Sequence, residues 1–400
     1  MEFDEFCRAH TEVWDRYLSK VYSTIANGKA KLAEGVLLFP NMVLYTETDD
    51  HYLAEFFGAS PKYKRMIPRR HKELSTLRYL YQFADMEGNP LFAMNARNWL
   101  LKSLLLSRDI DINRVKERFG FNPYEDYPTR LRMTKEGGCL LSFGPEFQSC
   151  YLDNCLLVNT YEQIYRIKPI LNLTVVSKAF ATSDFIEDMK SKHVWPVQNT
   201  QELVGASYCP NRSASARILA GQFADLFLVP SLEERNIGKF LHKNPDFVRQ
   251  ALDCVDFLYE QRLEWQEGNL DSDQKYIQPD LLLKRADGYW DICDLKRPML
   301  DKTKVTKGQQ SRRRFIDYIQ EGVAQLANYE HYFGFQANSA YARKRYGVLV
   351  AIPRLILVVG NYENVDISEV REAARMLKPN YAIIDYDTLN ASFLFHASSR

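Results

Sequence analysis

The sequence lacks any run of about 18 or more apolar residues, the length that a membrane-spanning helix needs. Its longest apolar candidate, Tyr346 to Gly360, is interrupted by Pro353 and Arg354. The amino terminus is acidic and has no apolar core of the kind that marks a secretory signal. The 7 cysteines contain no close-spaced pair, which is typical of reduced thiols. We therefore expect a cytoplasmic protein with no membrane partner.

Several catalytic signatures are also missing. No glycine-rich loop ends in Gly-Lys-Ser or Gly-Lys-Thr, so ATP hydrolysis is not expected. Cys139, Cys150 and Cys155 lack paired spacing and a nearby histidine, which argues against a zinc site.

The net charge is only +1, so any contact with nucleic acid must come from local basic clusters.

Two such clusters exist. Eight basic residues and one acid lie between Lys296 and Arg314, and seven basic residues and one acid lie between Lys62 and Arg78. An isolated basic cluster is most often an ordinary solvated surface, but the first one begins inside the candidate site described below. The candidate phosphate contacts are Arg297, Lys302, Lys304, Lys307, Arg312, Arg313, Arg314, Arg69 and Arg70.

The length of 400 residues allows more than one hydrophobic core. Residues 205–215 are small, polar and broken by proline, as a domain boundary would be. We therefore predict two domains, at 1–210 and 211–400. The first mixes a helical pattern at 85–107 with short strands at 156–158 and 171–176, which predicts a separate α+β domain.

The second domain has a clearer pattern. Ser231 and Glu234 have capping-box spacing at the start of a helix that ends by Asn244-Pro245. Further helices are predicted at 247–265, 313–333 and 367–377, and strands at 280–284, 289–296, 347–352, 355–359 and 381–385. This order predicts an α/β fold with a mixed sheet flanked by helices.

The most informative segment is the predicted hairpin, in which Asp280 begins one strand and Asp294-Leu-Lys296 ends the next. Side chains alternate on a strand, so Asp294 and Lys296 share a face. A two-residue loop at Asp287-Gly288 would place Asp280 opposite Leu295, and the acids would face away from each other. A three-residue loop, with Gly288 left-handed, would place Asp280 opposite Asp294. A shared site therefore requires a loop with an odd number of residues.

Two carboxylates on adjacent strands can hold Mg²⁺, which keeps several waters and bridges to substrate phosphate. Lys296 would orient the attacking water or stabilise the phosphate oxygens. Glu234, at the start of the preceding helix, is the candidate third acid, with a helix-capping role as the alternative. For the hairpin itself, the alternative is a surface Asp–Lys pair with no catalytic role.

Four segments, in order, resemble the Shedu anti-phage family. They are an acid before an apolar helix (residues 234–245), the two halves of the hairpin (279–298), Gln325-Leu-x-x-Tyr329 on the following helix, and a tail that includes Ile384-Asp-Tyr386. The resemblance covers about residues 230–386. One departure is Asp294, because many Shedu proteins have Glu at that position of the triplet.

The resemblance implies a restriction-endonuclease-like PD-(D/E)xK nuclease domain at 211–400, with Gln325 near the site. It also implies cleavage of double-stranded DNA, a homo-oligomer such as a tetramer, and a role in bacterial defence. The variable first domain would sense, regulate or contact DNA.

We therefore predict a Mg²⁺-dependent endodeoxyribonuclease, with Mn²⁺ as a substitute, that hydrolyses phosphodiester bonds of foreign DNA. Its catalytic residues are Asp280, Asp294, Lys296, Glu234 and Gln325, and its metal ligands are Asp280, Asp294 and Glu234. The alternative is a catalytically idle nuclease fold that binds DNA or assembles a complex.

Overall fold

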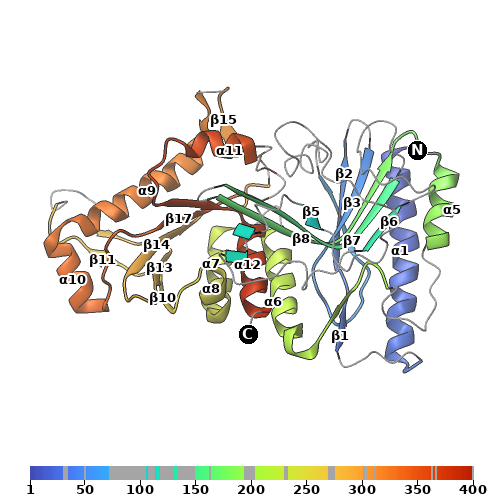
Figure 1. Cartoon of the computed structure of the whole chain (residues 1–400), viewed down its shortest axis with the longest axis horizontal. Coiled ribbons are helices and arrows are strands. Elements are labelled where there is room, and N and C mark those ends of the chain that lie inside the picture. The colour runs from blue at the N-terminus through green and yellow to red at the C-terminus, as the bar shows by residue number, and fades with distance from the viewer. Residues whose placement is uncertain are drawn as a thin grey trace. The chain divides into compact units, whose positions relative to one another are not determined.

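The computed structural model describes residues 1–29, 35–48, 51–71, 105–106, 113–114, 116–117, 130–133, 149–161, 164–192, 203–228, 233–268, 275–300, 302, 304–309, 312–361, 364 and 367–398. Figure 1 shows their mixed α/β architecture. The chain divides into two compact units. The first comprises Met1–Asn159, Ile167–Asp225 and Ala397–Arg400, and the second comprises Thr160–Arg166 and Leu226–His396. The predicted division at 210 to 211 falls at the start of helix α6 (Asn211–Phe227), whereas the units divide near its end.

The first unit packs helix α1 (Phe3–Ala26) against a sheet. The strand order is β8 (Ile164–Ser177), β3 (His51–Phe57), β2 (Met42–Glu47) and β4 (Ile67–His71), and β7 (Ser149–Tyr161) joins at β8. Smaller strands are β5 (Leu105–Leu106), β6 (Arg130–Met133), β1 (Val36–Leu38) and β9 (Ser207–Cys209). Helix α5 (Thr182–Lys192) packs beside α1. The core contains Phe6, Trp14 and Leu18 of α1, whose spacing places them on one helix face.

Two sequence predictions for this unit can be compared with the structure. The strands expected at 156–158 and 171–176 are confirmed, as parts of the longer β7 and β8. Of the helical stretch expected at 85–107, only Leu105–Leu106 are described, and they form strand β5. The remainder of that prediction lies outside the described residues.

The second unit is built on a mixed sheet in the order β10 (Asp256–Tyr259), β13 (Leu281–Lys284), β14 (Trp290–Leu295), β17 (Leu355–Val358) and β18 (Tyr381–Ile384). The first three strands are antiparallel, and β14, β17 and β18 are parallel. Helix α9 (Asp317–Gly334) covers one face through Ile319, Leu326 and Tyr332, which pack with Leu282, Ile292, Leu355 and Leu357. The expectation of a mixed sheet with flanking helices is confirmed.

The remaining elements of the second unit are short helices and two-residue strands. The helices are α7 (Glu234–Lys243), α8 (Pro245–Ala251), α10 (Gln336–Tyr346), α11 (Ile367–Ala374) and α12 (Tyr386–Ser398). The strands are β11 (Leu263–Glu264), β12 (Tyr276–Ile277), β15 (Thr306–Lys307) and β16 (Arg314–Phe315). Helix α12 had no counterpart in the prediction.

The hairpin of β13 and β14 has the register that the candidate site requires. Leu281 pairs with Cys293, and Lys284 pairs with Trp290. The Arg285 amide donates to the Tyr289 carbonyl at 2.8 Å, which leaves a three-residue loop, and Gly288 has a φ of 87°. The predicted odd loop with a left-handed glycine is therefore confirmed. The next pair along the ladder places Asp280 opposite Asp294.

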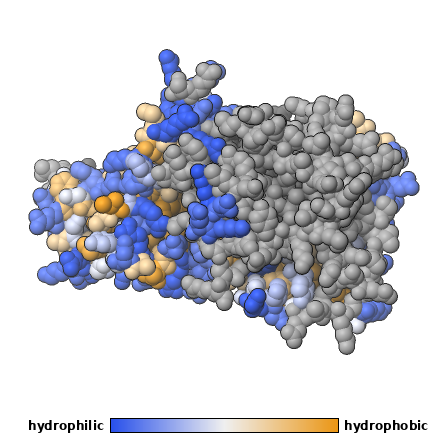
Figure 2. All heavy atoms as spheres, in the orientation of Figure 1, coloured by the Kyte–Doolittle hydropathy of each residue, from blue (hydrophilic) through white to orange (hydrophobic). Residues whose placement is uncertain are grey.

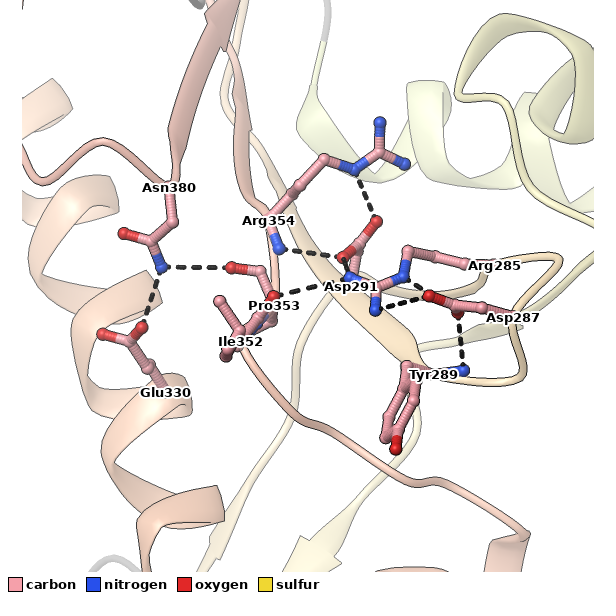
Figure 3. A network of polar contacts seen from close by, with 9 residues as sticks. All are labelled: Arg285, Asp287, Tyr289, Asp291, Glu330, Ile352, Pro353, Arg354 and Asn380. Carbon is pink, nitrogen blue, oxygen red and sulfur yellow. Dashed lines mark hydrogen bonds and ion pairs between the residues drawn. The ribbon is translucent and has the colours of Figure 1, made fainter.

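A buried carboxylate holds the loop end of this hairpin. Figure 3 shows Asp291 between Arg285 and Arg354. Asp291 is 0% exposed, with one oxygen 3.1 Å from Arg285 Nη1 and the other 2.6 Å from Arg354 Nε. The backbone amide of Arg354 also donates to Asp291 at 2.8 Å. These contacts join the hairpin to the chain that enters β17.

The structure corrects several predicted elements. Helix α8 ends at Ala251, and residues 256–259 form strand β10, because Asp253 adopts a left-handed conformation (φ 52°) that stops the helix. Residues 347–352 form no strand, and α9 begins at Asp317 because Arg314–Phe315 pair with β15. The N-cap of α7 is Glu233, so the predicted cap at Ser231 is wrong.

No helix within the described ranges is both long and apolar enough to cross a bilayer. On the face drawn in Figure 2, hydrophilic residues cover much of the described surface, and apolar residues form small separate areas.

Candidate active site

The centre of the candidate site is the end of β14, where Asp294 and Lys296 lie on the face that α9 covers. Both side chains are almost fully buried. Lys296 Nζ lies 2.6 Å from Asp294 Oδ2 and 2.7 Å from Gln325 Oε1 on α9. A protonated amine satisfies this arrangement because it can donate to both oxygens. The structure thus brings together three of the predicted site residues.

Helix α9 approaches β14 closely at Gly322. A methyl group at Gly322 would lie 2.9 Å from both Lys296 Cε and Leu357 Cδ1. Gln325 follows one turn later, on the side of α9 that faces the strand. The absence of a side chain at Gly322 therefore lets the lysine stem pass beneath the helix and reach Gln325.

The backbone of Lys296 is held from two sides. Its amide donates to the Val358 carbonyl at 2.9 Å, and its carbonyl accepts from the buried Tyr386 hydroxyl at 2.7 Å. Just beyond, Asn364 donates to the carbonyls of Pro298 and Met299 at 2.7 and 2.8 Å. Tyr386 lies within the tail segment that the sequence singled out, and its contact with Lys296 gives that segment a physical role.

Asp280 directly precedes β13 and connects three strands. Its Oδ2 accepts from the Leu295 amide at 2.6 Å, and its backbone carbonyl accepts from the Glu260 amide at 2.9 Å. The carboxylate thus continues the β13–β14 ladder by one hydrogen bond beyond the last backbone pair. Burial raises the pKa of the nearby Cys293 thiol well above its usual value, and the charges of Asp280 and Asp294 raise this pKa further.

Glu234 is the first residue of α7, and its side chain lies outside the described residues. Gly238 lies four residues later, on the same face of the helix. A methyl group at Gly238 would lie 2.4 Å from the Tyr259 hydroxyl oxygen, so this face packs against the end of β10. The backbone thus places position 234 on the face of α7 that packs toward β10, and β10 pairs with β13, which Asp280 directly precedes.

The sequence prediction missed Glu260, the acid directly after β10. Tyr259 pairs with Leu281, so the next pair along that ladder is Glu260 with Asp280. The Tyr259 hydroxyl donates to Glu260 Oε1 at 2.7 Å. Burial, this hydrogen bond and the nearby Asp280 all raise the pKa of Tyr259. The segment had been predicted as helix, so no pattern in it pointed to a pairing with β13.

The predicted DNA contacts after Lys296 form two groups. Lys304 and Arg313 lie 2.8 and 2.7 Å from Glu369 Oε1, and Lys307 pairs with Asp317. The side chains of Arg297, Lys302, Arg312 and Arg314 are exposed, and so is that of Lys304 beside Glu369. Lys304, Lys307 and Arg313 thus have acidic partners within the protein, and of these three Lys304 also faces solvent.

The other two predicted DNA contacts are on the edge strand β4 of the first unit. Arg70 Nη1 lies 2.5 Å from Asp4 Oδ1, and its guanidinium lies over the ring of Phe3. Arg69 is partly exposed on the same strand. Lys62, Lys64 and Arg65 of the same basic stretch are exposed, whereas Lys72 and Arg78 lie outside the described residues.

The donor set at this site suits a hard divalent cation. Asp280 and Asp294 supply carboxylate oxygens from adjacent strands, the ligand type that Mg²⁺ and Mn²⁺ accept. Among the residues that the structure places, no three acidic, histidine or cysteine side chains gather closely enough to hold a metal ion. The two acids therefore fit such an ion as part of a shell completed by water or substrate oxygens.

Comparison with known proteins gives no relative, because no family model and no curated protein matches the chain.

Proposed function

We propose that the second unit is a metal-dependent phosphodiesterase of the PD-(D/E)xK type, with a restriction-endonuclease-like fold. The observation that carries this proposal is the group formed by Asp294, Lys296 and Gln325, with Asp280 one strand away in the matching register. A surface Asp–Lys pair would not explain why the Asp294 side chain is only 4% exposed and that of Lys296 only 8%, and why a helix glycine makes room for the lysine.

The roles of the residues follow from their contacts. Asp280 and Asp294 would hold Mg²⁺ or Mn²⁺, which supplies charge neutralisation at the phosphate and a more acidic water. Lys296 would orient the attacking water or stabilise charge on the phosphate oxygens, since its ammonium is already fixed between two oxygen acceptors. Gln325 would keep that ammonium in place. Glu234 would assist from the start of α7.

The substrate in this proposal is double-stranded DNA. The exposed Arg297, Lys302, Arg312 and Arg314 follow the site directly in sequence and would contact backbone phosphates without reading bases. On the resemblance to Shedu proteins, the biological role would be defence of a bacterial cytoplasm against phage, by a homo-oligomer such as a tetramer. The first unit would then sense, regulate or contact DNA.

The decisive experiment incubates linear duplex DNA with MgCl₂ and either wild type or Lys296→Ala. We expect cleavage by the wild type, none with EDTA, and a loss of about 100-fold or more in the variant. Lys284→Ala, a change at the far end of β13, is the matched control and should cleave like wild type. Equal cleavage by wild type and Lys296→Ala would refute the site.

The rival proposal is an idle nuclease fold that binds DNA or assembles a complex. The exposed arginines support it as well as they support catalysis. It predicts that wild type and Lys296→Ala bind duplex equally and that neither cleaves it with Mg²⁺ or Mn²⁺. Cleavage that is lost only in Lys296→Ala would exclude this rival.

A further inference from the structure

One stripe of helix α9 contacts the parts of the candidate site in turn. Gly322 makes room for the stem of Lys296, and Gln325 lies 2.7 Å from the Lys296 ammonium. Farther along the helix, the Tyr329 hydroxyl donates to the carbonyl of Gln278, close to the first acid, at 3.3 Å. Residues spaced by three or four positions share one face of a helix. This stripe of α9 consists of Tyr318, Gly322, Gln325 and Tyr329.

Tyr318, the first residue of the stripe, contacts Arg297, which directly follows Lys296. The guanidinium carbon of Arg297 lies 5.6 Å from the centre of the Tyr318 ring, within the range of a cation–π contact. The Tyr318 hydroxyl also accepts a hydrogen bond from the Arg297 amide at 3.3 Å. The Arg297 side chain is exposed. The ring therefore restrains the guanidinium while its N–H donors stay available, because a ring face accepts none of the strong hydrogen bonds that these donors can form.

Arg297 differs from other stacked arginines in what its N–H groups bind. Arg70, Arg262 and Arg285 also lie over aromatic rings, and each of the three donates to a carboxylate or amide oxygen of the protein. Within the part of the chain that the structure describes, the Arg297 side chain has no such acceptor. A guanidinium with available donors matches the oxygens of a phosphate group, which it can bind through two parallel hydrogen bonds.

We infer that Arg297 binds a backbone phosphate of the substrate beside the reacting one, and that Tyr318 is the positioning residue for its guanidinium. This inference rests on the proposed function and narrows it, because it makes Arg297 a fixed part of the site and sets it apart from the other exposed basic residues. The contact holds substrate and transition state alike, so it acts on KM and not on kcat.

The test combines duplex binding with cleavage kinetics for wild type, Arg297→Ala, Tyr318→Leu and the double variant. Fluorescence anisotropy of a labelled duplex in EDTA, across a salt series, measures binding, and cleavage with MgCl₂ gives kcat and KM. We expect Arg297→Ala to weaken binding about 10-fold and to lower the slope of log affinity against log salt by about 1. KM should rise by a similar factor, with kcat within about twofold of wild type.

Tyr318→Leu tests the positioning role. Loss of the ring should weaken binding about 3-fold when Arg297 is present and have no further effect in Arg297→Ala. Tyr318→Phe keeps the ring and should bind within about twofold of wild type. Tyr289→Leu is the matched control, because the Arg285 guanidinium lies over that ring at the same 5.6 Å, at the loop end of the hairpin (Figure 3). It should bind and cleave like wild type, and the melting temperature of each variant reports its folding.

The outcomes separate this inference from the function on which it rests. If wild type cleaves and Arg297→Ala keeps its affinity, KM and salt slope, the phosphate contact is refuted and the proposed function stands. If Tyr318→Leu weakens binding equally with and without Arg297, Tyr318 does not act through Arg297 and its positioning role is refuted. If duplex binding depends on Arg297 as expected but wild type cleaves with neither Mg²⁺ nor Mn²⁺, the proposed function fails and the phosphate contact stands.

Discussion

The carboxylate of Asp280 accepts a hydrogen bond from the backbone amide of Leu295 at 2.6 Å. The first acid of the proposed site therefore also closes the ladder between β13 and β14. This double role makes the contributions of Asp280 to stability and to chemistry separable by mutation, because an amide oxygen can accept the same hydrogen bond without the charge.

Asp280→Asn and Asp280→Ala should thus differ in stability and agree in activity. Asn keeps an acceptor for the Leu295 amide, whereas Ala leaves that amide without one, at a cost of about 1–3 kcal/mol in the free energy of unfolding. Both variants remove a carboxylate and should lose cleavage. Urea unfolding and a plasmid cleavage assay measure the two effects. A fully active Asp280→Asn would show that the carboxylate serves the fold alone.

Gly322→Ala should impair cleavage with little loss of stability. Alanine raises helix propensity by about 1 kcal/mol, and this gain offsets part of the close contacts with Leu357 and Lys296. The lysine stem must move, and a displacement of about 1 Å in a catalytic group can reduce the rate about 100-fold. Gly334→Ala is the control, because it lies on the same helix and a methyl group added there would meet no atom within 4 Å.

Cleavage rates and melting temperatures of Gly322→Ala and Gly334→Ala test this prediction. If Gly322→Ala cleaves as fast as Gly334→Ala, the position of the Lys296 ammonium does not depend on the close approach of α9. The proposed role of Gly322 would then be abandoned.

The sequence left a two-residue and a three-residue loop open at Asp287-Gly288, and the requirement that the two acids face each other selected the odd loop that the structure has. The alternation of side chains along a strand placed Asp294 and Lys296 on one face. Gln325 came from the family resemblance, and its contact with Lys296 depends on helix packing that no local pattern encodes.

The failures have equally specific causes. Residues 248–259 carry apolar side chains at helical spacing, but Asp253 turns left-handed without being a glycine, and the rest of the segment becomes strand β10. The pairing of Glu260 with Asp280 therefore could not be foreseen. The contacts of Lys304 and Arg313 with Glu369 join segments that lie far apart in sequence, so a count of basic residues could not reveal these ion pairs.

These ion pairs predict different roles for neighbouring arginines. Arg314 is exposed, so Arg314→Ala should weaken DNA binding and lower the slope of log affinity against log salt by about 1. Arg313 is held by Glu369 and Glu372 at 2.7 Å each, so Arg313→Ala should leave the salt slope unchanged and lower the melting temperature. Fluorescence anisotropy across a salt series, with a thermal melt of each variant, measures both. Equal slopes for the two variants would contradict this division.

The Asp291 network should stabilise the fold without serving catalysis. Asp291→Ala leaves Arg285 and Arg354 facing each other without their shared carboxylate, and breaking such a buried pair costs about 3 kcal/mol in the free energy of unfolding. Asp287 pairs with the same Arg285 at 2.9 Å but is exposed, so Asp287→Ala should change stability little.

Since Lys296 lies at the other end of β14, the Asp291→Ala protein should still cleave DNA at temperatures where it stays folded. Chemical unfolding of both variants tests the difference in stability, and a cleavage assay at low temperature tests the separation from catalysis. A stable Asp291→Ala protein that has lost cleavage would instead connect this network to the site.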